Sequence, residues 1–194
     1  MTLHITGDAE ADALLQDDPF ALLVGMLLDQ QVAMETAFAG PRKILDRVGT
    51  LEPAAVAGYD PEAFAAAFSQ TPAVHRFPGS MAGRVQALAA AVVGDWGGDA
   101  ARIWTDGGDG ATPTGAEVLK RLKKLPGFGE QKAKIFLALL GKQCGYGGDG
   151  WREAAGAYGE PGSFRSVADI TSPESLAKVR ETKRAAKSAA KEAR

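Results

Sequence analysis

The chain has 194 residues, one cysteine and a formal net charge of −2 at pH 7. This length suffices for one domain or two small lobes with a hydrophobic core. The single cysteine, Cys144, excludes an internal disulfide and any site that needs four cysteines, such as an iron–sulfur cluster. No signal peptide opens the chain, and the apolar run 20–28 is too short to cross a membrane, so a cytoplasmic protein without membrane contact is expected.

The hydrophobic pattern predicts helices almost throughout and no strand, so the expected fold class is all-α. Asp18 can cap a helix that begins with Pro19, and the segment 20–38 that follows is apolar on most sides. Its pattern indicates one long, buried helix. Further helices are predicted at residues 42–48, 53–57, 61–68 and 81–93.

The second half begins with a glycine-rich stretch, residues 94–115, that is typical of turns. The last predicted helix begins with Pro173, and Thr171 or Ser172 caps it. Residues 178–194 carry seven Lys or Arg against two Glu, a local balance of +5. That balance fits a nucleic-acid-binding face, and it equally fits a solvated tail.

The stretch "KKLPGFGEQKAKIF", residues 123–136, lies where two helical patterns meet. Thr114 and Glu117 have capping-box spacing at the start of the first helix, and Pro126 ends it. Gly127 and Gly129 allow backbone angles or close approaches that a side chain would forbid. The pattern therefore predicts a tight hairpin between two helices.

Such a hairpin has a chemical use, because the first amides of the second helix lack intrahelical partners and attract anions. A phosphate could approach them closely over the two glycines, with Lys132 and Lys134 following. The ordinary alternative is a plain Pro-Gly turn with solvated lysines.

The stretch "LLDQQVAMETAF" places Gln30 and Gln31 in the middle of the predicted buried helix. A buried amide costs free energy unless it is hydrogen-bonded. Both side chains could be satisfied by the neighbouring backbone or by water. Alternatively, one of them faces a cleft and fills space inside an opened duplex.

Three segments together resemble the helix-hairpin-helix (HhH-GPD) superfamily of base-excision-repair DNA glycosylases. "LKKLPGFGEQKAKIFLALLG" resembles its hairpin, whose usual form is Leu-Pro-Gly-hydrophobic-Gly. "LLDQQV" is similar to its glutamine-bearing helix, which lies about a hundred residues upstream, as it does here. "FPGSMAGRVQALAAAVV" resembles the segment between them, and the resemblance covers roughly residues 20–152.

The resemblance implies a bilobal all-α fold with a DNA cleft between two lobes. One would be a central helical barrel, residues 22–125. The other would combine residues 1–21 with 126–194, including the hairpin's second helix and the basic C-terminal helix.

The implied partner is double-stranded DNA with a damaged or mispaired base, bound by a monomer. The hairpin, from Pro126 through Phe128 to Gly129, would hold a DNA phosphate, with Lys132 and Lys134 beside it. Gln31 would plug the gap left by the extruded nucleotide, with Gln30 next to it. No cofactor would be required, although a Na⁺ or K⁺ ion could sit on the backbone carbonyls of Lys123, Leu125 and Phe128.

Cleavage of an N-glycosidic bond builds positive charge on the sugar, which a carboxylate can stabilise. The family's spacing puts that aspartate at Asp149, which is also a natural N-cap for a helix from Trp151. Asp169 is the second candidate. The catalytic-lysine position of the family's bifunctional members is occupied by Gln131, which cannot form a Schiff base. Lys132 is one residue further along the helix, so its side chain is rotated by roughly 100° from that position and should not replace the lysine easily. We expect it to be either a phosphate contact or solvated.

Aromatic side chains could stack on a flipped base: Trp151 and Tyr146 are the base-pocket candidates, followed by His75 and Phe77. Each could equally be ordinary packing, and Arg152 and Arg165 could meet phosphates or form surface ion pairs.

The missing lysine and iron–sulfur cysteines narrow the function that the resemblance implies to that of a monofunctional DNA glycosylase. The alternative is a non-catalytic helix-hairpin-helix DNA-binding protein.

Overall fold

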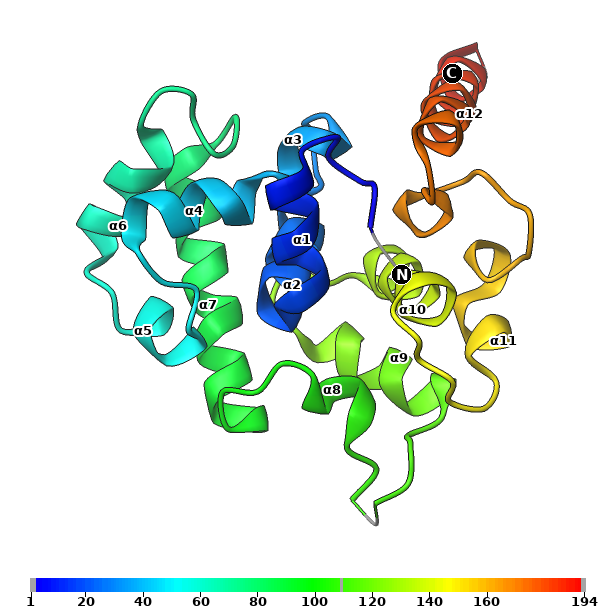
Figure 1. Cartoon of the computed structure of the whole chain (residues 1–194), viewed down its shortest axis with the longest axis horizontal. Helices are drawn as coiled ribbons and strands as arrows, with labels where there is room; N and C mark the ends of the chain where they lie inside the picture. The colour runs from blue at the N-terminus through cyan, green and yellow to red at the C-terminus, as the bar shows by residue number, and fades with distance from the viewer. Residues whose placement is uncertain (1–2, 109, 193–194) are drawn as a thin grey trace.

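A computed structural model of the chain describes residues 3–108 and 110–192, and this part consists of helices and loops without a strand (Figure 1). The predicted all-α class is confirmed. The first half contains α1 (Ala9–Asp17), α2 (Pro19–Leu28), α3 (Met34–Phe38), α4 (Gly40–Val48), α5 (Pro53–Ala57), α6 (Pro61–Ser69) and α7 (Pro78–Trp96). The second contains α8 (Arg102–Thr105), α9 (Gly115–Lys124), α10 (Glu130–Gln143), α11 (Trp151–Ala155), the 3₁₀ turns η1 (Gly156–Tyr158) and η2 (Val167–Asp169), and α12 (Pro173–Glu192).

Helix starts follow the local signals in the sequence. The Asp18 carboxylate accepts hydrogen bonds from the first amides of α2, which opens with Pro19. The Thr114 hydroxyl accepts from the Glu117 amide at 3.3 Å, and the Ser172 hydroxyl accepts from the Ser175 amide at 3.2 Å. These caps satisfy amides that would otherwise lack a partner.

The long helix predicted over residues 20–38 is wrong, because α2 ends at Leu28 and α3 begins only at Met34. Gln30 and Gln31 therefore lie in a turn and not in a helix. Gln31 has a φ of +58°, which a right-handed helix cannot contain. The apolar run hid this break, because α2 is buried on every side and hydrophobicity continues past its end.

The helices pack in two groups (Figure 1). In the first, α7 packs against α5, α6 and α2, and α2 contacts α1, α3 and α4. In the second, α10 contacts α9, α11, η1 and η2, while α12 contacts η2. Although α1 packs on α2 and α4, Leu3 lies beside the C-terminal end of α10. The division of the chain into lobes at residues 22–125 stays a prediction.

None of the helices in the described ranges is long and apolar enough to cross a membrane.

Candidate functional site

The hairpin between α9 and α10 has the predicted form, but its two glycines play different parts. Gly127 has a φ of +80°, and a β-carbon there would lie 2.2 Å from Cδ1 of Leu27. Gly129 is extended, and a β-carbon there would meet no atom within 4 Å. Gly127 is therefore required by the fold itself, whereas Gly129 keeps the entrance to α10 open.

The N-terminus of α10 has no side-chain cap, so the amides of its first turn have no acceptor within the described ranges. The Phe128 amide differs, because it donates to the carbonyl of Leu125 at 3.1 Å. The Phe128 ring is buried edge-on against Phe136, with ring centroids 5.9 Å apart. Phe128 thus shapes the hairpin from inside, and the open amides belong to the start of α10.

An acidic residue offsets part of the positive charge of the hairpin. Glu130, the first residue of α10, pairs with Lys134 at 2.7 Å and with Lys123 at 3.6 Å. The hydrogen bond from Lys134 is the main cause that lowers the pKa of the Glu130 carboxyl. Lys134, predicted to contact DNA, therefore already has an anionic partner.

A pocket of about 660 Å³ opens where the end of α2, the start of α10, η1 and α12 come together. It contains four of the predicted site residues: Gln30, Gln31, Gln131 and Lys132. Its walls consist of Met26, Asp29, Gln30, Gln31, Gln131, Lys132, Ile135, Ala157, Tyr158, Arg165, Thr182, Lys183 and Ala186.

The turn between α2 and α3 contains Gln30 and Gln31, and we call it the glutamine turn; the side chain of His75 holds it in place. Nδ1 of the buried His75 accepts from the Phe77 amide at 3.0 Å, so its Nε2 carries the proton and donates to the Gln30 carbonyl at 2.9 Å. The Gln30 side chain is engaged by Arg84 and by the Leu27 carbonyl. His75 thus supports the turn, while Gln31 stays exposed at the pocket in a strained backbone conformation.

Lys132 points into this pocket and is not simply solvated. Its ammonium donates a 2.6 Å hydrogen bond to the carbonyl of Leu27, at the C-terminal end of α2. Burial lowers the pKa of Lys132 to about 8, against the attraction of Asp29. The neighbouring Gln131 donates its side-chain amide to the hydroxyl of Tyr158 at 2.9 Å.

Asp29 is a pocket residue that the sequence analysis missed. It follows α2 directly, its side chain is 14% exposed, and Lys183 of α12 lies 3.9 Å from its Oδ2 atom. Burial is the largest cause that raises the pKa of Asp29, while Lys183 and Lys132 oppose the shift. Among the backbone groups and side chains that the structure describes, none donates a hydrogen bond to its carboxylate. The one signal in the sequence was an acid inside an apolar run.

Polar contacts connect helix α12 to the α2–α3 turn and to the start of α3. Arg180 forms an ion pair with Glu35, and the Lys183 ammonium lies 3.8 Å from the sulfur of Met34. Together with the contact between Lys183 and Asp29, these pairs connect the C-terminal helix to the first group of helices.

The structure does not bring Asp149 to the pocket. Asp149 is exposed, and its backbone carbonyl accepts from the Gly115 amide at 2.8 Å. The expectation that it caps the Trp151 helix is wrong, because Gly150, with a φ of +69°, is the N-cap and no side chain caps α11.

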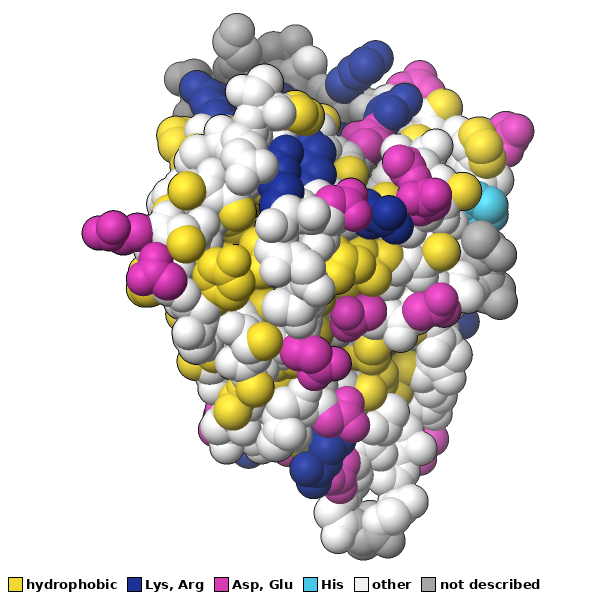
Figure 2. Space-filling model, turned by 60° about the vertical axis from the view of Figure 1, so that its left-hand side comes forward, with side chains coloured by type: hydrophobic (Ala, Val, Ile, Leu, Met, Phe, Trp, Pro, Cys, Tyr) yellow, Lys and Arg dark blue, Asp and Glu magenta, His cyan; other side chains and the backbone are white. Residues whose placement is uncertain are grey.

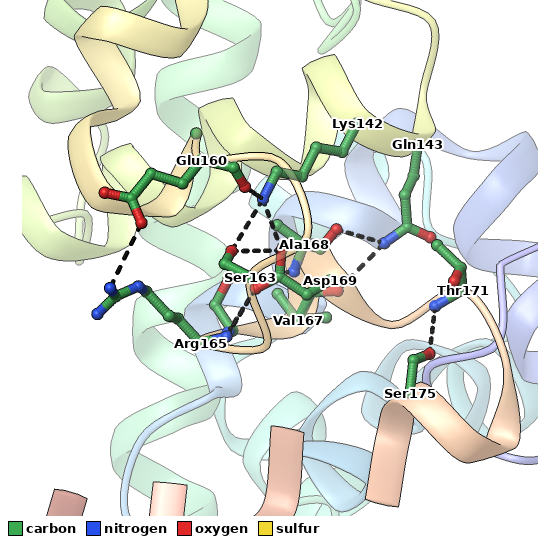
Figure 3. A network of polar contacts seen from close by, with 12 residues as sticks. Lys142, Gln143, Glu160, Ser163, Arg165, Val167, Ala168, Asp169, Thr171 and Ser175 are labelled. Atoms are coloured by element: carbon green, nitrogen blue, oxygen red, sulfur yellow. Dashed lines mark hydrogen bonds and ion pairs between the residues drawn. The ribbon is translucent and has the colours of Figure 1, made fainter. Parts of the chain in front are cut away.

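Asp169 is placed differently, inside a complete hydrogen-bond network (Figure 3). Its carboxylate accepts from Lys142 at 2.6 Å, from the Ser163 hydroxyl at 3.0 Å, and from the amides of Arg165 and Ser166 at 2.7 and 3.1 Å. It closes the capping box of η2 and does not line the pocket. The arrangement is that of a structural carboxylate.

The predicted base-pocket aromatics also lie elsewhere. The buried Tyr146 donates to the carbonyl of Pro113 at 2.5 Å. Trp151 packs against Gly141, with the guanidinium of Arg152 at 4.3 Å from its ring centroid. The aromatic ring that lines the pocket is Tyr158, which the sequence analysis did not single out.

The cation predicted at the hairpin stays a prediction. Of the three proposed carbonyls, that of Leu125 already accepts from Phe128. Among the described residues, no group of three or more His, Cys, Asp and Glu side chains could hold a metal ion.

One comparison with known proteins bears on this arrangement. A family model described as "HhH-GPD superfamily base excision DNA repair protein" matches residues 24–191. The chain belongs to the HhH-GPD superfamily. It is accordingly a DNA-binding protein of base-excision repair, and the matched span runs from α2 to α12, including every wall of the pocket. No curated protein and no solved structure matches the chain.

Proposed function

We propose that this HhH-GPD protein is a monofunctional DNA glycosylase. It hydrolyses the N-glycosidic bond of a damaged or mispaired base and leaves the abasic strand intact. The observation that carries the proposal is the pocket itself, about 660 Å³ in volume, which is lined by the hairpin helix, the glutamine turn and the mostly buried carboxylate of Asp29. That volume lies in the usual range of small-molecule sites, roughly 300–1,000 Å³.

The parts of the pocket suit an extruded nucleotide. The uncapped amides of α10 and the open face at Gly129 can receive a backbone phosphate. Gln31 stands exposed at the pocket and is available to fill the space that the nucleotide leaves. Tyr158 offers an aromatic face for the flipped base.

Positive charge for DNA binding must be local, because the chain as a whole carries −2. Figure 2 shows acidic and basic side chains interspersed over one face of the molecule, without a single large basic area. We assign the attraction to the uncapped start of α10, to Lys132 and to the basic helix α12.

The residues at the pocket support a reaction without a lyase step. Gln131 stands where a Schiff-base lysine would be, and a neutral amide cannot attack C1′. Lys132 also lines the pocket, but its ammonium donates a hydrogen bond to the Leu27 carbonyl and, with a pKa of about 8, it is mostly protonated at pH 7. A protonated amine has no lone pair for attack.

The test is incubation with duplexes that carry uracil, hypoxanthine, alkylated or oxidised bases. Excision of at least one base is expected, with strand breaks only after alkali and no adduct trapped by borohydride. A trapped adduct that disappears in Lys132→Gln would show that the enzyme is bifunctional. Tight binding of these duplexes without excision would favour the non-catalytic DNA-binding alternative.

A further inference from the structure

The proposed reaction needs a negative charge close to the sugar, because the transition state is an oxocarbenium-like cation. The carboxylates expected from sequence spacing do not provide it. Asp149 is exposed outside the pocket, and Asp169 is committed to four hydrogen bonds around η2 (Figure 3). A different acidic side chain must face the sugar.

We propose that Asp29 is the catalytic carboxylate of this pocket, an inference that rests on the proposed glycosylase function. It lines the pocket together with Lys132 of the hairpin helix. It also immediately precedes Gln30 and Gln31, so the same turn would present the charge and the plug to one extruded nucleotide.

The lone pairs of Asp29 are available. Within the described ranges its carboxylate accepts no hydrogen bond, and its one ion-pair contact, with Lys183, is long at 3.9 Å. Asp169 illustrates the opposite case, because four donors already occupy its oxygens. A carboxylate with free lone pairs can bind a water molecule or face a developing cation.

The groups around Asp29 come from three elements. Lys132 of α10 and Lys183 of α12 favour its ionised form, whereas Glu35 of α3 opposes it. Glu35 is itself paired with Arg180, which offsets its charge. The net result is a raised pKa with burial as its largest cause, which makes the Asp29 carboxylate more basic than an exposed aspartate, as suits a general base.

The proposed reaction is a hydrolysis. The bond between C1′ and the base nitrogen breaks, and its electron pair leaves with the base. The Asp29 carboxylate stabilises the cationic sugar and takes a proton from the water whose oxygen bonds to C1′. The proton then passes through solvent to the departed base, so one water is consumed and the products are a free base and an abasic hydroxyl.

The first experiment is single-turnover excision of whichever lesion the wild type removes fastest from the panel. Asp29→Asn should lower the rate about 10²-fold or more, with duplex affinity no weaker than that of the wild type. The matched control is Glu35→Gln, which removes a neighbouring carboxylate from α3 and should change the rate less than tenfold. Asp149→Asn should keep the wild-type rate.

The second experiment uses a cationic mimic of the sugar and does not need turnover. A duplex with a pyrrolidine abasic analogue should bind the wild type at least tenfold more tightly than one with a neutral tetrahydrofuran analogue. Asp29→Asn should lose this preference while its tetrahydrofuran affinity does not fall. Because Asp29 accepts no hydrogen bond in the described ranges, the variant should melt within a few degrees of the wild type.

The outcomes separate the two proposals. If the wild type excises a lesion and Asp29→Asn keeps both its rate and its pyrrolidine preference, the role of Asp29 is refuted while the glycosylase function stands. A loss of rate in Asp149→Asn alone has the same meaning and returns the role to Asp149. A wild type that excises nothing and shows no pyrrolidine preference refutes both.

Discussion

Replacement of Lys132 by methionine should stabilise the free protein at neutral pH. Lowering the pKa of Lys132 from 10.5 to about 8 is equivalent to ~3 kcal/mol against the charged form. Because the ammonium opens onto a wet pocket and would lose its bond to Leu27, screening reduces the expected gain to about 1–2 kcal/mol. The melting temperature should then rise by roughly 2–6 °C.

The pH dependence of this gain is the sharper measurement. Between pH 8 and 10.5 the unfolded chain binds more protons at this lysine than the folded protein does, so wild-type stability rises with pH across that window. The advantage of Lys132→Met should shrink over the same range and vanish above it. Urea denaturation at pH 7, 8.5 and 10 measures the difference in unfolding free energy between the variant and the wild type. A difference that stays constant with pH would refute the conclusion that burial lowers the pKa of Lys132.

DNA binding should respond in the opposite direction. A phosphate beside Lys132 would stabilise its charged form, so Lys132→Met should weaken binding of an undamaged duplex at pH 7. Wild-type affinity should fall as pH rises from 7 to 9, because the free protein loses the proton near pH 8. Fluorescence anisotropy checks both effects, and equal affinities of variant and wild type at pH 7 would exclude a phosphate contact.

Four further substitutions test the hairpin and the turn. Gly127→Ala should lower the free energy of unfolding, measured by urea denaturation, by about 2–4 kcal/mol, since the new β-carbon meets Leu27 and the φ is positive. Gly129→Ser should fold normally but bind duplex more weakly, because its hydroxyl can accept hydrogen bonds from the free amides of α10. Glu130→Gln should raise duplex affinity severalfold in anisotropy, as it frees its two lysine partners; unchanged affinity would show that they do not reach DNA. Gln31→Gly should raise stability by about 1 kcal/mol, because glycine tolerates the positive φ, and should slow excision; a loss of stability would contradict the assigned strain.

Features encoded by neighbouring residues could be predicted from the sequence. The start of α2 follows from Asp18 and Pro19, and the hairpin follows from the proline and the two glycines that separate its helices. The end of α2 could not be predicted, because helix burial on all sides removes the periodic signal. The positive φ of Gln31 has no local signature, and the His75 side chain that bonds the carbonyl of the preceding Gln30 comes from 45 residues away.

The pocket depends on contacts between distant segments, and there sequence reasoning was weaker. Asp29 and Lys183 are more than 150 residues apart, yet they face each other across the pocket. Counting along the family's spacing led instead to Asp149, whose exposure follows from the path of the loop before α11. Tyr158 enters the pocket through its bond with Gln131, a pairing that no local pattern announces.

The ties between α12 and the α2–α3 turn have a consequence for the ionic-strength dependence of DNA affinity. Each phosphate neutralised by a free cation releases condensed counterions and adds about 0.9 to the slope of log affinity against log salt. Arg180 and Lys183 already face Glu35 and Asp29, so moving to DNA would exchange one anionic partner for another. These two side chains should add little to the slope in the wild type. Their contribution should appear only when the carboxylates are removed, so the slope of Glu35→Gln should be steeper by up to about 0.9.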